Sequence, residues 1–104
     1  IFLGSSNDSE NSINIILNIK KKKEIKEKDI SGKISSHNII LDIDLFIKNI
    51  KDGKKVKNNF KKSASFNVAS SHSDTLSNEK NAIKNLAEAI TEDIVSFLAI
   101  YLNN

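Results

Sequence analysis

The sequence predicts an α+β fold, a two-layer sandwich in which an antiparallel meander of about three strands carries one long amphipathic helix. Two observations lead to this class. Between residues 13 and 69, apolar residues recur mostly at every second position, as in half-buried strands. Between residues 73 and 102 they recur at three- and four-residue steps, as in an amphipathic helix. No linker or internal repeat divides the 104 residues, so residues 1–104 are interpreted as one domain.

The first strand is expected to begin at Ile13. Its apolar positions alternate with polar ones and are Ile13, Ile15, Leu17 and Ile19. The strand runs into four consecutive lysines, 20–23, and a charged stretch that breaks at Ser31-Gly32. Residues 1–12 are interpreted as the end of a truncated N-terminal element and a polar loop.

The second strand has one apolar face, made of Ile39, Leu41, Ile43, Leu45 and Ile47. Because a buried carboxylate is costly, the opposite face with Asp42 and Asp44 is expected to meet water or a partner. An Asp52-Gly53 turn then joins two alternating runs, which is a strong hairpin signal. The third strand is expected to place its apolar residues on one face: Val56, Phe60, Ala64, Phe66 and Val68.

The C-terminal helix is expected from about residue 73 to residue 102. Its apolar stripe consists of Ile83, Leu86, Ala87, Ile90, Ile94, Phe97, Leu98 and Tyr101. Ser73 or Ser77 is expected to cap the helix, with Glu79 in the first turn, where the helix dipole favours an acid. The stripe should lie across the apolar face of the sheet.

Composition narrows the chemistry. The chain has no cysteine, which excludes disulfides and thiolate sites. No stretch is long and apolar enough to span a bilayer. The formal net charge is +3 and every basic residue is lysine. Two explanations stay open for that excess: the codon usage of an AT-rich genome, or a surface suited to an anionic partner.

Signals for catalysis are weak. His37 and His72 lie in polar stretches without further ligands at metal-binding spacing, so both are interpreted as surface histidines. Asp42 and Asp44 share a strand face about 7 Å apart, and a solvated face is favoured over an acid–base pair. No serine stands in a nucleophile elbow, and no glycine-rich phosphate loop is present. The sequence therefore predicts a non-enzyme without a cofactor or metal.

An ordered set of short motifs carries a resemblance. These are Ala64-Ser65-Phe66-Asn67-Val68, Ser71, Thr75-Leu76, Glu79-Lys80-Asn81-Ala82, Glu92-Asp93-Ile94 and Leu98-Ala99-Ile100-Tyr101, preceded by Gly32, Asn38 and Asp52-Gly53-Lys54. In this order they resemble the alphaproteobacterial LptE family, small lipoproteins of lipopolysaccharide assembly, over roughly residues 13 to 102. The family's lipidated cysteine, first strand and first helix have no counterpart before Ile13. If they are absent, one flank of the sheet face should be bare.

The resemblance implies a binding role. A member of this family would be a partner and plug of the LptD barrel, assisting lipopolysaccharide export from the periplasmic side of the outer membrane. Its membrane contact would be an N-terminal lipid anchor that this chain does not contain, and no nucleic acid would be expected. Lysines near the predicted ligand-facing turn are the candidate lipopolysaccharide-binding residues: Lys21, Lys23, Lys26, Lys28 and Lys33.

Two alternatives remain beside this hypothesis. The lysine run is also typical of a solvated hairpin connection with no ligand. The whole chain is also compatible with a small basic interaction domain that binds nucleic acid or another anionic partner, although no aromatic residues are interleaved with the lysines 20–23.

Overall fold

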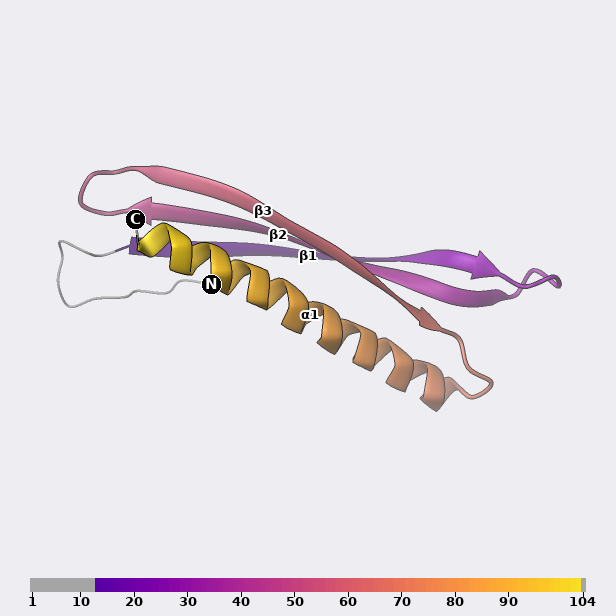
Figure 1. Cartoon of the computed structure of the whole chain (residues 1–104). Coiled ribbons are helices and arrows are strands. Elements are labelled where there is room, and N and C mark those ends of the chain that lie inside the picture. Colours follow the sequence, from indigo (N-terminus) through magenta and orange to yellow (C-terminus); the bar gives the residue numbers. More distant parts are fainter. Residues whose placement is uncertain (1–12, 104) are drawn as a thin grey trace. The chain divides into compact units, whose positions relative to one another are not determined.

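The computed structural model describes residues 13–103, so the N-terminal element expected at 1–12 lies outside the described residues. Its four elements are β1 (Ile13–Lys28), β2 (Ile34–Asn49), β3 (Lys55–Asn67) and α1 (His72–Leu102). The strands form one antiparallel sheet in the order β1-β2-β3, and α1 follows as the long C-terminal helix (Figure 1). The predicted α+β class is confirmed.

The described residues divide into two compact units. The first unit contains residues 13–20 and 42–60, which are the start of β1 and the β2–β3 hairpin. The second unit contains residues 21–41 and 61–103, which are the β1–β2 hairpin, the end of β3 and α1.

The first unit has one buried sheet face, and its hairpin turn lies where the sequence predicts it. Its buried residues are Ile13, Ile15, Ile43, Leu45 and Ile47. At the turn, the backbone N–H of Asn49 donates to the carbonyl of Lys54 at 2.9 Å. Gly53 has a φ of +71°, a backbone conformation that favours glycine, and this is why the Asp-Gly pair marks the turn.

The second unit places α1 on one face of its part of the sheet. The helix buries Ala82, Leu86, Ile90 and Ile94, which recur every four residues and share one side of the helix. Ile39 and Phe66 are buried on the strands of the same unit. The remaining residues of the predicted stripe are half-buried: Ile83, Ala87, Phe97, Leu98 and Tyr101.

Strand β1 is longer than the sequence indicates. It continues through the lysine run and ends only at Lys28, because β2 begins at Ile34 and offers a partner along this length. All of residues 21–28 are exposed. The hydrophobic pattern stops near residue 19 since the second half of β1 has no buried face, and a strand without a buried face leaves no period-two signal.

The start of the helix differs from the prediction. The N-cap is Ser71, whose Oγ accepts a hydrogen bond from the backbone N–H of Asp74 at 3.1 Å. The expected caps, Ser73 and Ser77, therefore lie inside α1, and the acid in the first turn is Asp74 rather than Glu79. The cap comes earlier because the chain needs only residues 68–71 to turn from β3 into the helix.

Candidate functional site

The five lysines proposed from the resemblance do not form one surface. Four of them lie on the second half of β1, where successive side chains point to opposite faces. Lys21 and Lys23 share the face that carries α1, whereas Lys26 and Lys28 lie on the opposite face. The fifth, Lys33, stands just beyond the β1–β2 turn.

Two of these lysines have polar partners within the second unit. The Nζ of Lys23 lies 3.5 Å from Oε2 of Glu79 on α1. On the opposite face, the Nζ of Lys26 donates to Oγ of Ser65 on β3 at 3.3 Å. Lys23 is thus partly neutralised, and Lys26 keeps an unneutralised charge.

Asp29 organises the turn that precedes Lys33. One of its carboxylate oxygens accepts hydrogen bonds from the Oγ of Ser31 at 2.6 Å and from the backbone N–H groups of Ser31 and Lys33, both at 2.9 Å. The Ser31 hydroxyl, followed by the Lys33 backbone, lowers the pKa of Asp29 below its ordinary value. The turn therefore keeps a carboxylate among the lysines of this hairpin.

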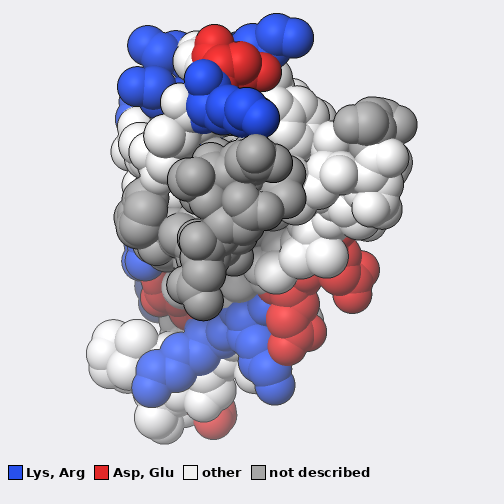
Figure 2. All heavy atoms as spheres, turned by 90° about the vertical axis from the view of Figure 1, so that its left-hand side faces the viewer, with Lys and Arg blue, Asp and Glu red and all other residues white. Residues whose placement is uncertain are grey.

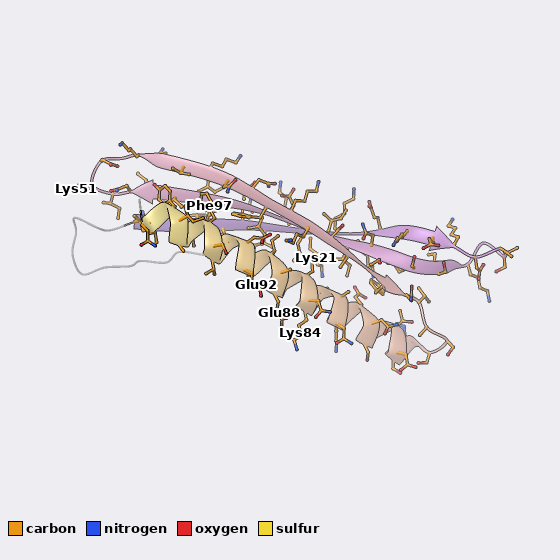
Figure 3. All side chains as sticks on the ribbon, viewed as in Figure 1. Lys21, Lys51, Lys84, Glu88, Glu92 and Phe97 are labelled. Carbon is orange, nitrogen blue, oxygen red and sulfur yellow. The ribbon has the colours of Figure 1, made fainter. Side chains whose placement is uncertain are left out.

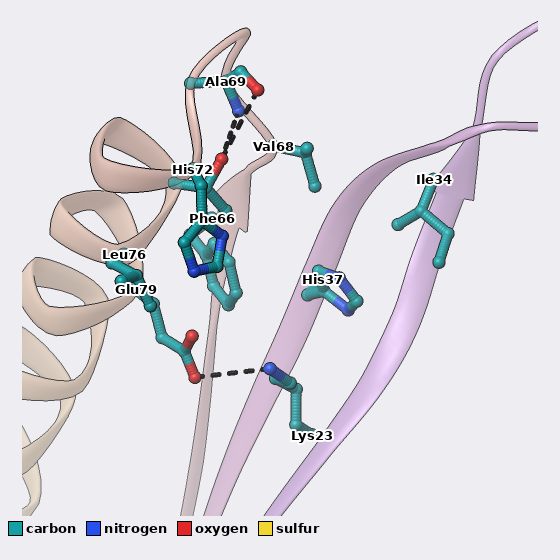
Figure 4. Close-up of a pocket in the computed structure, with 10 residues that line it drawn as sticks. Lys23, Ile34, His37, Phe66, Val68, Ala69, His72, Leu76 and Glu79 are labelled. Carbon is teal, nitrogen blue, oxygen red and sulfur yellow. Dashed lines mark hydrogen bonds and ion pairs between the residues drawn. The ribbon is translucent and has the colours of Figure 1, made fainter.

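A pocket of about 420 Å³ opens between the first turns of α1 and the β1–β2 hairpin (Figure 4). Lys23 and Glu79 face each other across it, joined by their ion pair. Its apolar lining comes from Ile34, Phe66, Val68 and Leu76. The pocket combines a charged rim with an apolar wall, and Lys23 is the proposed lysine that lines it.

The histidines of this pocket differ in burial. His72 is exposed at the start of α1, as predicted. His37 is half-buried and stacks on Phe66, with ring centroids 5.3 Å apart, so the prediction of a plain surface histidine is wrong for this residue. The register set by the Asp52-Gly53 turn brings His37 opposite Phe66, which single-strand patterns do not reveal. Within the described residues, its buried Nδ1 has no hydrogen-bond partner.

The corner between β3 and α1 is built by a set of hydrogen bonds in which Ser71 and Thr75, two residues of the resemblance, take part. The Oγ1 of Thr75 accepts from the backbone N–H of Ala69 at 2.9 Å and donates to the carbonyl of Ser71 at 3.2 Å. The side-chain amide of Asn78 donates to the carbonyl of Asn67 at 3.0 Å. Together with the Ser71 cap, these bonds fix the direction in which the helix leaves the sheet.

In the first unit, Asp42 and Asp44 share one partner. The side-chain amide of Asn59 on β3 donates to Oδ1 of Asp42 at 2.6 Å and to Oδ1 of Asp44 at 2.8 Å. Both aspartates are half-buried. One amide group therefore donates to two neighbouring carboxylates on the sheet face.

Charge is distributed unevenly between sheet and helix. Residues 13–67 contain fourteen lysines and six acidic residues, whereas α1 contains two lysines and five acidic residues. Lys84, Glu88 and Glu92 lie one helical turn apart on the side of α1 that faces away from the sheet (Figure 3). The strands thus present the cationic surface and the helix a mildly anionic one.

The described residues contain no group of three histidine or acidic side chains placed to hold a metal ion. Among residues 13–103, no helix combines the length and apolar character needed to cross a membrane. Comparison with known proteins gives no match, either to a family model or to a curated protein.

Proposed function

We propose that this chain is a non-catalytic assembly protein of the LptE type, which binds an LptD-like barrel as partner and plug and assists lipopolysaccharide export at the outer membrane. One observation carries the proposal. Two motif residues of the resemblance, Ser71 and Thr75, make hydrogen bonds that help to build the β3–α1 corner. These two motif residues therefore have a structural role in this chain.

The charge distribution supports a binding role for the sheet. Lipopolysaccharide carries phosphates on lipid A, and a lysine-rich surface attracts such an anion without strict geometry. On the outer side of the β1–β2 hairpin, Lys26 and Lys28 are exposed and have no carboxylate partner in the described residues. These two, with Lys33 at the turn, are the stronger candidates for lipopolysaccharide contact. Lys23 is weaker, because Glu79 already pairs with it.

The competing function is a basic interaction domain for nucleic acid. The lysine excess of the strands favours it, because phosphate neutralisation dominates such binding. Against it, the lysines 20–23 have no aromatic residue among them that would stack on a base.

Co-purification separates the two functions. The gene that encodes this chain would be tagged in its native host, and solubilised membranes would be passed over the tag's resin. Recovery of an LptD-like barrel in stoichiometric amount supports the proposal. Retention of DNA that falls steeply with salt, without a barrel, would overturn it in favour of the second function.

A further inference from the structure

The first unit has a surface with features of a binding site. None of the five lysines named above lines it. It is a hollow of about 470 Å³ on the sheet face opposite the buried isoleucines. Its lining includes Asn14 and Ile16 of β1, Phe46 and Lys48 of β2, and Lys55 and Lys57 of β3. All of these residues belong to the first unit, whose hairpin end is seen in Figure 2 with lysines gathered beside acidic groups.

The floor of this hollow is apolar although it faces solvent. Ile16 is 51% exposed, and Phe46 beside it is half-buried. The Nζ of Lys57 lies 5.4 Å from the centroid of the Phe46 ring, a cation–π contact. The apolar side chains of this floor are in contact with water. Covering them with an apolar group would be favourable.

The rim of the hollow is cationic. Lys48, Lys55 and Lys57 surround the floor, and no ion pair joins any of them to a carboxylate within residues 13–103. The nearest acid along β2 on this face is Asp44, and the amide of Asn59 already holds its Oδ1. The three ammonium groups are therefore available to an anion that rests against the floor.

We propose that this hollow binds an anionic amphiphile, with a phosphate group among Lys48, Lys55 and Lys57 and the adjoining alkyl chain on Ile16 and Phe46. The volume is within the usual range for a small-ligand site, about 300–1,000 Å³. A free phosphate ion would leave the floor exposed, and an uncharged amphiphile would leave the three lysines unpaired. Lipopolysaccharide is itself an anionic amphiphile, so the inference rests on the proposed function and adds a second contact site to it. The test below needs no barrel, so its failure is distinct from a failure to recover a barrel.

The test compares three probes on the isotope-labelled 104-residue chain by NMR titration: octyl phosphate, octyl glucoside and inorganic phosphate, all below the micellar concentration. Octyl phosphate is expected to shift the amide signals of residues around Phe46 and Lys55. It should bind at least about tenfold more tightly than inorganic phosphate, because burial of two methylene groups is worth roughly that factor. It should exceed octyl glucoside, which has the same alkyl chain, by a similar factor, because the phosphate makes charge-assisted hydrogen bonds with the lysines. Equal binding of inorganic phosphate would show a simple phosphate site, and equal binding of octyl glucoside a purely apolar one; either result overturns the proposal.

Variants locate the site. The double substitution Lys55→Gln and Lys57→Gln is expected to lower octyl phosphate affinity about tenfold or more, with an unchanged circular dichroism spectrum. The control removes the same two charges from α1, through Lys80→Gln and Lys84→Gln, and should leave the affinity within about twofold, since neither lysine lines the hollow. Phe46→Ser should remove the preference for octyl phosphate over inorganic phosphate. An equal loss in the control and in the strand variant would overturn the location.

Discussion

The Nζ of Lys23 on β1 lies 3.5 Å from Oε2 of Glu79 on α1, and this ion pair joins the bare half of β1 to the helix. The hydrophobic core does not reach this flank, since Ile25 of the same strand is 50% exposed. The end of β1 is therefore held to α1 by a polar contact at the rim of the pocket.

Breaking this pair should cost little global stability. Lys23→Gln or Glu79→Gln is expected to lower the free energy of unfolding by at most about 1 kcal/mol, because both side chains reach solvent. The exchanged pair, Lys23→Glu with Glu79→Lys, should recover most of the loss in a double-mutant cycle measured by urea unfolding. A coupling energy of zero would mean that the pair contributes nothing.

Substitutions on the buried face of α1 should cost more stability than breaking this ion pair. Ile90 is 1% exposed, so Ile90→Ala is expected to cost roughly 2–5 kcal/mol through lost burial and a residual cavity. In a chain of this size, that is a large part of the total stability. The matched control is Val95→Ala on the exposed side of α1, where Val95 is 58% exposed and the change should stay within about 0.5 kcal/mol. Similar unfolding midpoints for the two variants would contradict the assigned helix face.

Substitution of Asn59 should change the stability of the chain, because its amide donates to two carboxylates. Asn59→Asp replaces the donor to Asp42 and Asp44 by a third carboxylate. A loss of about 1 kcal/mol is expected at low salt, and it should shrink as salt screens the repulsion. Asn59→Lys, which supplies a cation instead, should be at least as stable as the parent chain. Unfolding curves at low and high salt check both, and a salt-independent loss would point to a steric cause.

The turn that Asp29 organises is expected to lose stability in acid. Hydrogen bonds to its carboxylate, from the Ser31 hydroxyl first, hold its pKa below the ordinary value of 3.8. Because the folded pKa is the lower one, the stabilisation is present above the unfolded pKa and is lost as pH falls through the folded pKa. An NMR titration should therefore place the Asp29 midpoint below 3.8. Ser31→Ala should raise it, whereas Ser63→Ala on β3 should leave it unchanged.

The sequence predicted correctly those elements that have one buried face and one exposed face. The alternation of β2 and the four-residue spacing of Leu86, Ile90 and Ile94 reflect burial directly, and both were confirmed. The second half of β1 was not predicted as strand, because its lysines face solvent on both sides. The helix cap was misplaced by two residues or more, since several serines compete near Ser71 and only the local backbone geometry selects among them.

The candidate sites were less accessible to sequence reasoning. The five lysines were grouped by proximity along the chain, whereas the strand distributes four of them over two faces. The pairs His37–Phe66 and Phe46–Lys57 depend on how β2 and β3 are aligned. The structure pairs Asn49 with Lys54, across a longer turn than the two residues Asp52-Gly53. Counting outward from a two-residue turn would start from Lys51 and Lys54 and would miss both pairs.

We propose that this chain is a plug enclosed by a barrel, and cross-linking from two opposite faces of the second unit is the sharpest test of that proposal. A photoreactive residue would replace Val95 on α1 in one strain and Lys61 on β3 in another, both exposed and both in the second unit. Because Lys62 pairs with Asp93 of α1, its neighbour Lys61 points to the opposite face of the sheet. Both positions are expected to cross-link to the same outer-membrane barrel in living cells. Cross-links from neither position to a barrel, or from one face alone, would contradict the enclosed plug.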